Sequence, residues 1–157
     1  MIDTAIARRK IIGVIGGGQC SSEVYDKAQE VGRLIAEAGI ALICGGMSGV
    51  MEAACKGAQQ AGGLTIGILP TDSAADANPW VSIPIATGMG IGRNIIIVRS
   101  APALIAIDGS YGTLSEISFA LQLNKPVFCL DPWLTVPGTQ LVHSPEEAVG
   151  KAVDIFQ

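Results

Sequence analysis

Residues 107–116, IDGSYGTLSE, combine acidic, glycine and hydroxyl residues directly after an apolar run. Thr113 and Glu116 have the T-x-x-E spacing of a capping box, in which each side chain bonds the other's backbone amide and Thr113 begins a helix. Glycines before a helix are also typical of phosphate-binding loops, and Glu116 would then be an acid beside a bound phosphate. The segment leaves both interpretations open, and we expect Glu116 to start the helix in either case.

Alternating strands and helices are expected to position these residues. Short apolar runs predict strands at 11–15, 40–44, 64–69, 81–87, 103–107 and 127–130. Helical spacing and start signals predict helices at 24–38, 50–61, 92–100, from Thr113 onward, and at 145–156. Pro84 makes the fourth strand the poorest, because proline cannot donate to a central ladder. We predict an α/β fold of one domain, residues 1–157, with a doubly wound, Rossmann-like, mostly parallel sheet and helices on both faces.

Three of the predicted strands end in glycine loops, at 16–18, 45–49 and 109–112. Ligands of such sheets bind beyond the carboxyl ends of the strands, where helix N-termini present unpaired amides. One loop alone would be explained as a tight turn, but three at one edge favour a bound phosphate. The candidate phosphate-binding residues are Gly17, Gly18, Gly45, Gly46, Ser48, Gly49, Gly109, Ser110, Gly112 and Thr113. Arg93 is a further candidate, because a cation at the start of a helix opposes the helix dipole unless it has an anion to bind.

Composition and charge exclude several classes of partner. The chain of 157 residues is 49% hydrophobic, yet no apolar run approaches the roughly 20 residues of a membrane span. Its net charge is −4 and its basic residues are scattered, so we expect neither nucleic-acid nor membrane binding. No targeting segment is visible, which makes the cytoplasm the expected location. The apolar surplus predicts a homodimer or a higher homo-oligomer.

Familiar nucleotide and metal signatures are missing. Residues 16–21, GGGQCS, lack the last glycine of G-x-G-x-x-G, and the second strand ends in Cys44 rather than a ribose-binding acid, so NAD is not expected. There is no P-loop motif and no C-x-x-C pair, and we expect no metal site. Cys44, Cys55 and Cys129 lie in apolar patterns and are expected to be buried, whereas Cys20 follows a glycine loop and is expected to be more exposed.

Three segments together resemble a known superfamily. Residues 44–70, CGGMSGVMEAACKGAQQAGGLTIGILP, the GRN at 92–94 and the DGSYGTLSE at 108–116 are similar to the "lysine decarboxylase-like" proteins. These include the cytokinin-activating phosphoribohydrolases, or lonely guy family, and the molybdenum cofactor carrier proteins. The resemblance spans about residues 11–131.

The resemblance implies roles for individual residues. The phosphoribohydrolase motifs, M-x-x-R-K and P-G-G-x-G-T-x-x-E, place Arg93 on the motif arginine, Gly109, Gly112 and Thr113 on the phosphate loop, and Glu116 on the catalytic acid. Four residues depart from these motifs, namely Gly90, Asn94, Asp108 and Ser110, which stand for methionine, lysine, proline and glycine. The Arg93–Asn94 pair is closer to the carrier branch. Decarboxylase chemistry is not expected, since no lysine lies in a strand-end loop to form a Schiff base.

Two functions remain open, and whether the protein is an enzyme is undecided. The slightly favoured one is the binding of a phosphorylated small molecule, a nucleotide or a pterin phosphate such as molybdenum cofactor, by the glycine loops with Arg93 and Asn94. The alternative is an N-glycosidase that releases the free base from a nucleoside 5′-monophosphate, with Glu116 and Arg93 as catalytic residues.

Overall fold

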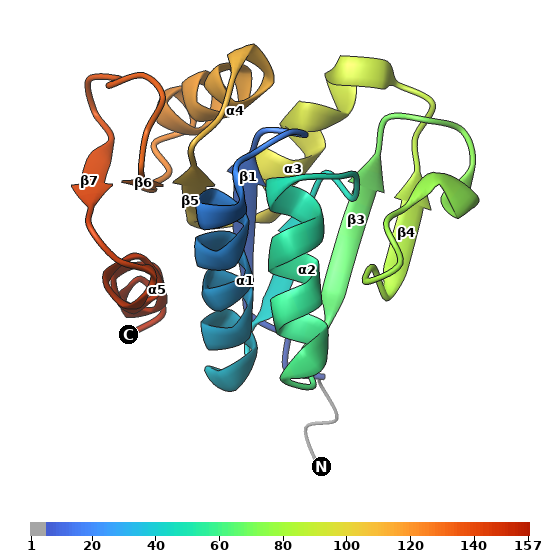
Figure 1. Ribbon diagram of the computed structural model, residues 1–157, viewed down its shortest axis with the longest axis horizontal. Helices are drawn as coiled ribbons and strands as arrows, with labels where there is room; N and C mark the ends of the chain where they lie inside the picture. The colour runs from blue at the N-terminus through green and yellow to red at the C-terminus, as the bar shows by residue number, and fades with distance from the viewer. Residues whose placement is uncertain (1–5) are drawn as a thin grey trace, which may run out of the picture.

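A seven-stranded parallel sheet forms the centre of the protein (Figure 1). The computed structural model describes residues 6–157. The strands are β1 (Ile11–Gly16), β2 (Ala41–Cys44), β3 (Thr65–Leu69), β4 (Ile83–Ala86), β5 (Leu104–Ile107), β6 (Val127–Leu130) and β7 (Gln140–Val142). Their order is β4-β3-β2-β1-β5-β6-β7, and all neighbours pair in parallel. The chain therefore winds outward from β1 in both directions, which confirms the predicted doubly wound α/β fold.

Helices cover both faces of the sheet, as predicted (Figure 1). The helices are α1 (Ser22–Glu37), α2 (Val50–Gln60), α3 (Asn94–Ser100), α4 (Tyr111–Gln122) and α5 (Pro145–Asp154). Packing between helices groups α1 with α2 and α5, and groups α3 with α4. Two apolar clusters form the core, one on each side of the sheet. Two short 3-10 helices, η1 (Ala74–Asp76) and η2 (Gly90–Arg93), lie before β4 and α3.

The contact between α1 and α2 is a backbone contact. A Cβ at Gly32 of α1 would lie 1.9 Å from the carbonyl oxygen of Ala54, and one at Gly57 of α2 would lie 1.8 Å from that of Gln29. Only glycine permits this approach, since no side-chain atom fits at such distances. Because α1 and α2 each begin after a glycine loop, their packing also sets the distance between these loops.

The start of α4 differs from the sequence prediction. Ser110 is the N-cap, the helix begins at Tyr111, and Thr113 Oγ1 accepts the Ser110 amide (3.3 Å) in a capping box formed by these two residues. The predicted Thr113–Glu116 box is therefore wrong, because Ser110 lies one turn earlier and provides an equally good cap. Glu116 does not start the helix but lies more than one turn inside it.

Other differences concern the edges of the sheet. The fourth predicted strand is shortened to β4 and lies at one edge, where the missing amide of Pro84 does no harm. At the opposite edge β7 was not predicted, because Gln140–Val142 is too short for an apolar pattern.

The exposure of the four cysteines agrees with the sequence prediction. Cys44, Cys55 and Cys129 are buried and Cys20 is partly exposed.

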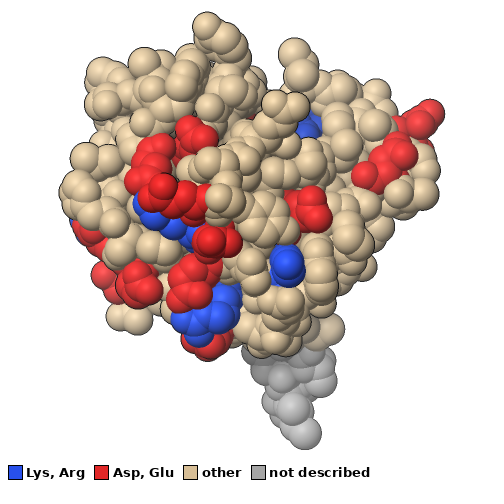
Figure 2. Space-filling view, in the orientation of Figure 1, with Lys and Arg blue, Asp and Glu red and all other residues tan. Residues whose placement is uncertain are grey.

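Charged side chains are unevenly distributed over the face shown in Figure 2. They gather left of centre, over α1, and a separate acidic group lies at the upper right, while the top of the molecule is mostly uncharged (Figure 2). Part of this charge belongs to ion pairs on the α1 surface, such as Arg33 with Glu30 and Glu37. Among residues 6–157, no helix combines the length and the hydropathy that crossing a membrane would require.

Candidate ligand-binding site

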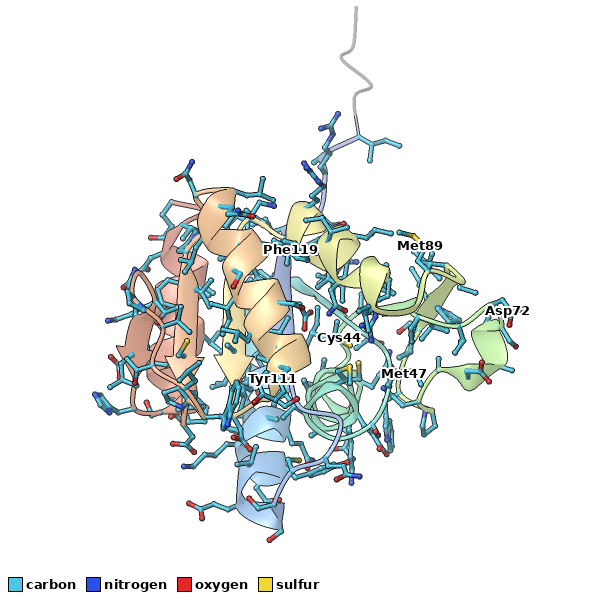
Figure 3. The ribbon with its side chains drawn as sticks, turned by 90° about the horizontal axis from the view of Figure 1, so that it is seen from above. Cys44, Met47, Asp72, Met89, Tyr111 and Phe119 are labelled. Atoms are coloured by element: carbon cyan, nitrogen blue, oxygen red, sulfur yellow. The ribbon has the colours of Figure 1, made fainter. Side chains whose placement is uncertain are left out.

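A cavity of about 160 Å³ lies at the carboxyl edge of the sheet. This edge of the sheet is at the top in Figure 1. Seen from above, Tyr111 at the start of α4 and Met47 in the second glycine loop lie on either side of Cys44 (Figure 3). The cavity is lined by Val14, Ile15, Gly16, Gly18, Gly45, Met51, Ile91, Arg93, Asn94, Ser110, Gly112, Thr113 and Glu116. The tertiary structure thus brings residues of all three glycine loops together with Arg93, Asn94 and Glu116.

A wider, open depression adjoins the cavity. It is lined by Gly17, Gly18, Gln19, Ser48 and Ser110, of which Gly18 and Ser110 also line the cavity. The two hollows therefore form one continuous crevice with a narrow inner part and an open outer part.

Three predicted binding glycines line neither hollow. A Cβ at Gly46 would lie 2.5 Å from Leu69 Cδ2, and one at Gly49 would lie 2.3 Å from the Gly17 carbonyl oxygen. A Cβ at Gly109 would lie 2.8 Å from the Thr113 side chain. All three glycines have positive φ. Gly46, Gly49 and Gly109 are thus required by the shape of the loops themselves.

Arg93 is fixed against the carboxyl ends of β2 and β3. Its Nε donates to the Ile68 carbonyl oxygen (2.8 Å) and its Nη2 to that of Gly45 (3.4 Å). A Cβ at Gly45 would lie 2.6 Å from Nη2, so glycine at this position leaves room for the guanidinium. Burial lowers the pKa of Arg93, but a guanidinium stays protonated in proteins. Arg93 therefore provides a fixed positive charge in the cavity wall.

Asn94 connects Arg93 to the start of α4. Its Oδ1 accepts a hydrogen bond from Arg93 Nη1, and its Nδ2 donates to Ser115 Oγ (3.1 Å). Ser115 Oγ in turn donates to the Gly112 carbonyl oxygen (2.6 Å). This chain of bonds holds the guanidinium in a set position relative to the first turn of α4. Asn94 is itself buried, which fits a positioning role better than direct exposure to solvent.

Glu116 is a buried acid without a partner. It is 7% exposed, lines the cavity, and within residues 6–157 forms neither a hydrogen bond nor an ion pair. Burial raises the pKa of Glu116 to about 8; the charge of Arg93 lowers it and Cys44 raises it. The carboxyl group is therefore mostly neutral at pH 7, and its free hydrogen-bonding groups face the cavity.

The helix starts around the crevice are not equivalent. The amides of Tyr111 and Gly112 open α4 without an intrahelical acceptor, while the Thr113 amide belongs to the capping box with Ser110. At the start of α2 the Val50 amide already donates to the Gly17 carbonyl oxygen (3.0 Å). The Ser48 hydroxyl likewise donates to Gly18 (2.7 Å). The first two loops thus bond each other, whereas the Tyr111 and Gly112 amides at the start of α4 remain available to a ligand.

Comparison with known proteins gives a family for this arrangement. Residues 9–154 match the SLOG cluster4 family, which is nearly the whole chain. The chain belongs to the SLOG cluster4 family.

Solved structures share the fold of this SLOG cluster4 protein. The molybdenum cofactor binding protein of Rippkaea orientalis is 38% identical, with a TM-score of 0.89, and the match covers 96% of this chain and 99% of that one. The molybdenum cofactor carrier protein of Chlamydomonas reinhardtii is 33% identical, with a TM-score of 0.83, over 95% of this chain and 99% of that one.

A third relative is an enzyme. The cytokinin riboside 5′-monophosphate phosphoribohydrolase of Mycobacterium tuberculosis is 30% identical over 127 residues, 71% of this chain and 65% of that protein. The superfamily resemblance predicted from the motifs is thereby confirmed, and the carrier-like proteins match this SLOG cluster4 chain over more of its length.

Sequence reasoning missed part of the crevice of this SLOG cluster4 protein. Met51 and Ile91 line the cavity and Gln19 lines the outer depression, although none was a candidate. Gln19 and Met51 each lie within two residues of a glycine loop, and this adjacency was the available signal. Ile91 is 86% exposed, and an isoleucine before a helix carries no such signal.

Proposed function

We propose that the protein binds a phosphorylated small molecule of the molybdenum cofactor type, with the phosphate at the start of α4. The observation that carries this proposal is the pairing of a fixed guanidinium with a buried, unpartnered acid in one small cavity. Arg93 supplies positive charge, and a neutral Glu116 donates a hydrogen bond where an ionised one would repel the anion. The carrier-like relatives support the same class of ligand.

The cavity also has free space at Gly112, in the first turn of α4. A Cβ at Gly112 would meet no atom within 4 Å, and Gly112 has no positive φ. The fold therefore does not require glycine there, although glycine in a helix costs about 1 kcal/mol relative to alanine. Because Gly112 lines the cavity, the missing side chain leaves space for a ligand to approach the first turn of α4.

The proposal is tested by thermal unfolding with sulfate, inorganic phosphate and AMP. We expect each at millimolar concentration to raise the Tm, because a ligand that binds only the folded protein stabilises it. Gly112→Val should remove this shift by placing methyl groups in the ligand's space.

The matched control is Gly150→Val. Gly150 also lies in a helix, α5, with no atom within 4 Å of its Cβ position, but outside the crevice. The Gly150→Val variant should keep the increase in Tm that the anions cause. Absence of any Tm increase in the unmodified protein with all three anions would contradict the proposal. Mass spectrometry of the natively purified protein would identify a retained ligand.

A second candidate function is hydrolysis of a nucleoside 5′-monophosphate. It is favoured by the relative from Mycobacterium tuberculosis and by the protonated state of Glu116, which can supply a proton to the departing base. Incubation with AMP separates the two functions. Under the binding proposal, free adenine does not exceed the amount released by Glu116→Gln, whereas release well above that background establishes the hydrolase.

A further inference from the structure

Two exposed aromatic rings lie beside the crevice. Tyr111 and Trp133 form an edge-to-face pair with ring centroids 5.3 Å apart and planes at 79°. Tyr111 is 80% exposed and Trp133 45%, so most of the Tyr111 ring faces solvent. In an edge-to-face pair at least one ring keeps both of its faces free. The pair therefore offers flat apolar surface that the fold does not use.

The position of Tyr111 relates this surface to the crevice. Tyr111 lies in the chain between Ser110, which lines both hollows, and Gly112, which lines the inner cavity. Trp133 lies in the loop after β6 and lines a small cleft with Thr113, a residue that also lines the cavity. The aromatic pair thus borders the first turn of α4, where the proposed phosphate lies.

The size of the cavity shows that a ligand must extend beyond it. Its 160 Å³ suffices for a phosphate group, whereas pockets that enclose a whole drug-sized ligand measure about 300–1,000 Å³. The remainder of a phosphorylated ligand extends into the outer depression, which shares Gly18 and Ser110 with the cavity. On the Ser110 side of this opening, a flat ring system lies close to the aromatic pair, because Tyr111 follows Ser110 in the chain.

We propose that Tyr111 and Trp133 form a stacking subsite for a planar heterocycle, a nucleobase or a pterin, joined to the phosphate bound at the start of α4. This proposal rests on the proposed function and specifies the chemical class of its ligand. Stacking is tolerant of ring type, because every base has a π-face. The subsite therefore selects heterocyclic phosphates over sugar phosphates without reading hydrogen-bonding edges.

Titration calorimetry with matched ligands tests the subsite. GMP and neopterin monophosphate carry a heterocycle, while ribose 5-phosphate carries the same phosphate ester without one. We expect the heterocyclic ligands to bind about tenfold more tightly than ribose 5-phosphate. Tyr111→Ala removes the ring but keeps the backbone amide at the start of α4, so it should remove this advantage and leave the affinity for ribose 5-phosphate unchanged, while Tyr111→Phe should keep the advantage. The ratio of GMP to neopterin monophosphate affinity distinguishes the two sources of the heterocycle.

Fluorescence provides a second measurement. The chain has two tryptophans, and Trp80→Phe leaves Trp133 as the single one. In this variant GMP should quench the emission and ribose 5-phosphate should not. Equal affinities for GMP, neopterin monophosphate and ribose 5-phosphate would overturn the stacking subsite alone. If GMP, neopterin monophosphate, ribose 5-phosphate and inorganic phosphate all fail to bind, both the stacking subsite and the proposed function are overturned.

Discussion

At the residue scale, Glu116 is the side chain whose chemistry depends most on its surroundings. A glutamic acid in solution is ionised at neutral pH, but in the folded protein burial raises the pKa of Glu116 to about 8. Folding therefore favours the protonated form. Between the unfolded and folded pKa values the unfolded chain is ionised and the folded chain is not, so stability falls as the pH rises through this window.

We predict that Glu116→Gln stabilises the protein increasingly as the pH rises. Relative to the unmodified protein, its free energy of unfolding should gain about 3 kcal/mol between pH 5 and pH 8, because glutamine cannot ionise and avoids this loss. Urea denaturation at several pH values measures the difference. A difference that stays constant with pH would show that Glu116 ionises freely in the folded state.

The same titration should affect anion binding. Sulfate remains a dianion over this pH range, so its affinity reports changes in the protein alone. We expect sulfate affinity to fall above about pH 8 as Glu116 ionises, and to remain level in Glu116→Gln. A parallel decline in both proteins would assign the titration to another group.

At the scale of elements, the backbone contact between α1 and α2 determines how the first two glycine loops meet. The Val50 amide at the start of α2 donates to the carbonyl oxygen of Gly17, which lies before α1. This bond requires the two helices to lie as close as Gly32 and Gly57 allow. Two small residues far from the cavity thus support its loops.

We predict that Gly32→Ala and Gly57→Ala each destabilise the protein by about 3 kcal/mol. The new methyl group would lie within 2 Å of a backbone oxygen, so the helices must separate. Thermal unfolding should show a fall in Tm of about 10 °C. Gly150→Ala is the control, since its Cβ meets no atom and helix propensity alone should stabilise it. An unchanged Tm in Gly32→Ala would mean that the helices tolerate greater separation.

At the scale of the whole molecule, an apolar patch lies at the β4 edge. It consists of Ile83, Ile85, Met89 and Ile91, all exposed. Ile83 and Ile85 pair in register with Ile66 and Ile68 and share their face of the sheet, the face on which α3 and α4 pack. Pro84 hinders extension of the sheet by another strand, so a second copy would pack on the face of the patch.

We predict that the protein is a dimer or a multiple of dimers associated through this patch. Ile83→Lys combined with Ile85→Lys should yield monomers at micromolar concentration in sedimentation velocity, because the charges cannot be buried in an apolar interface. Leu141→Lys, at the exposed opposite edge strand β7, should leave the assembly unchanged. A monomeric unmodified protein would contradict the prediction.

The order of strands and helices could be predicted from the sequence, because it depends on local patterns. The apolar runs, the glycines that end them and Pro84 mark elements to within a few residues, and the alternation implies a parallel sheet. Sequence motifs could likewise assign four residues to the carboxyl edge of the sheet, namely Arg93, Asn94, Gly112 and Glu116. Strand β7 could not, because its pairing depends on β6 and not on its own three residues.

Only the tertiary structure decided how the candidate residues divide their roles. Ser110 and Thr113 both had the chemistry of a cap, and the path of the chain after β5 selected Ser110. The glycines were equivalent in sequence, but neighbouring atoms make Gly46, Gly49 and Gly109 necessary for the loops and leave Gly112 free for a ligand. Glu116 is an ordinary acid by residue type, and its pKa is raised by burial and by Cys44 against the opposing charge of Arg93, all of which other elements supply. Sequence specifies which groups are present, whereas their burial and distances are properties of the packed chain.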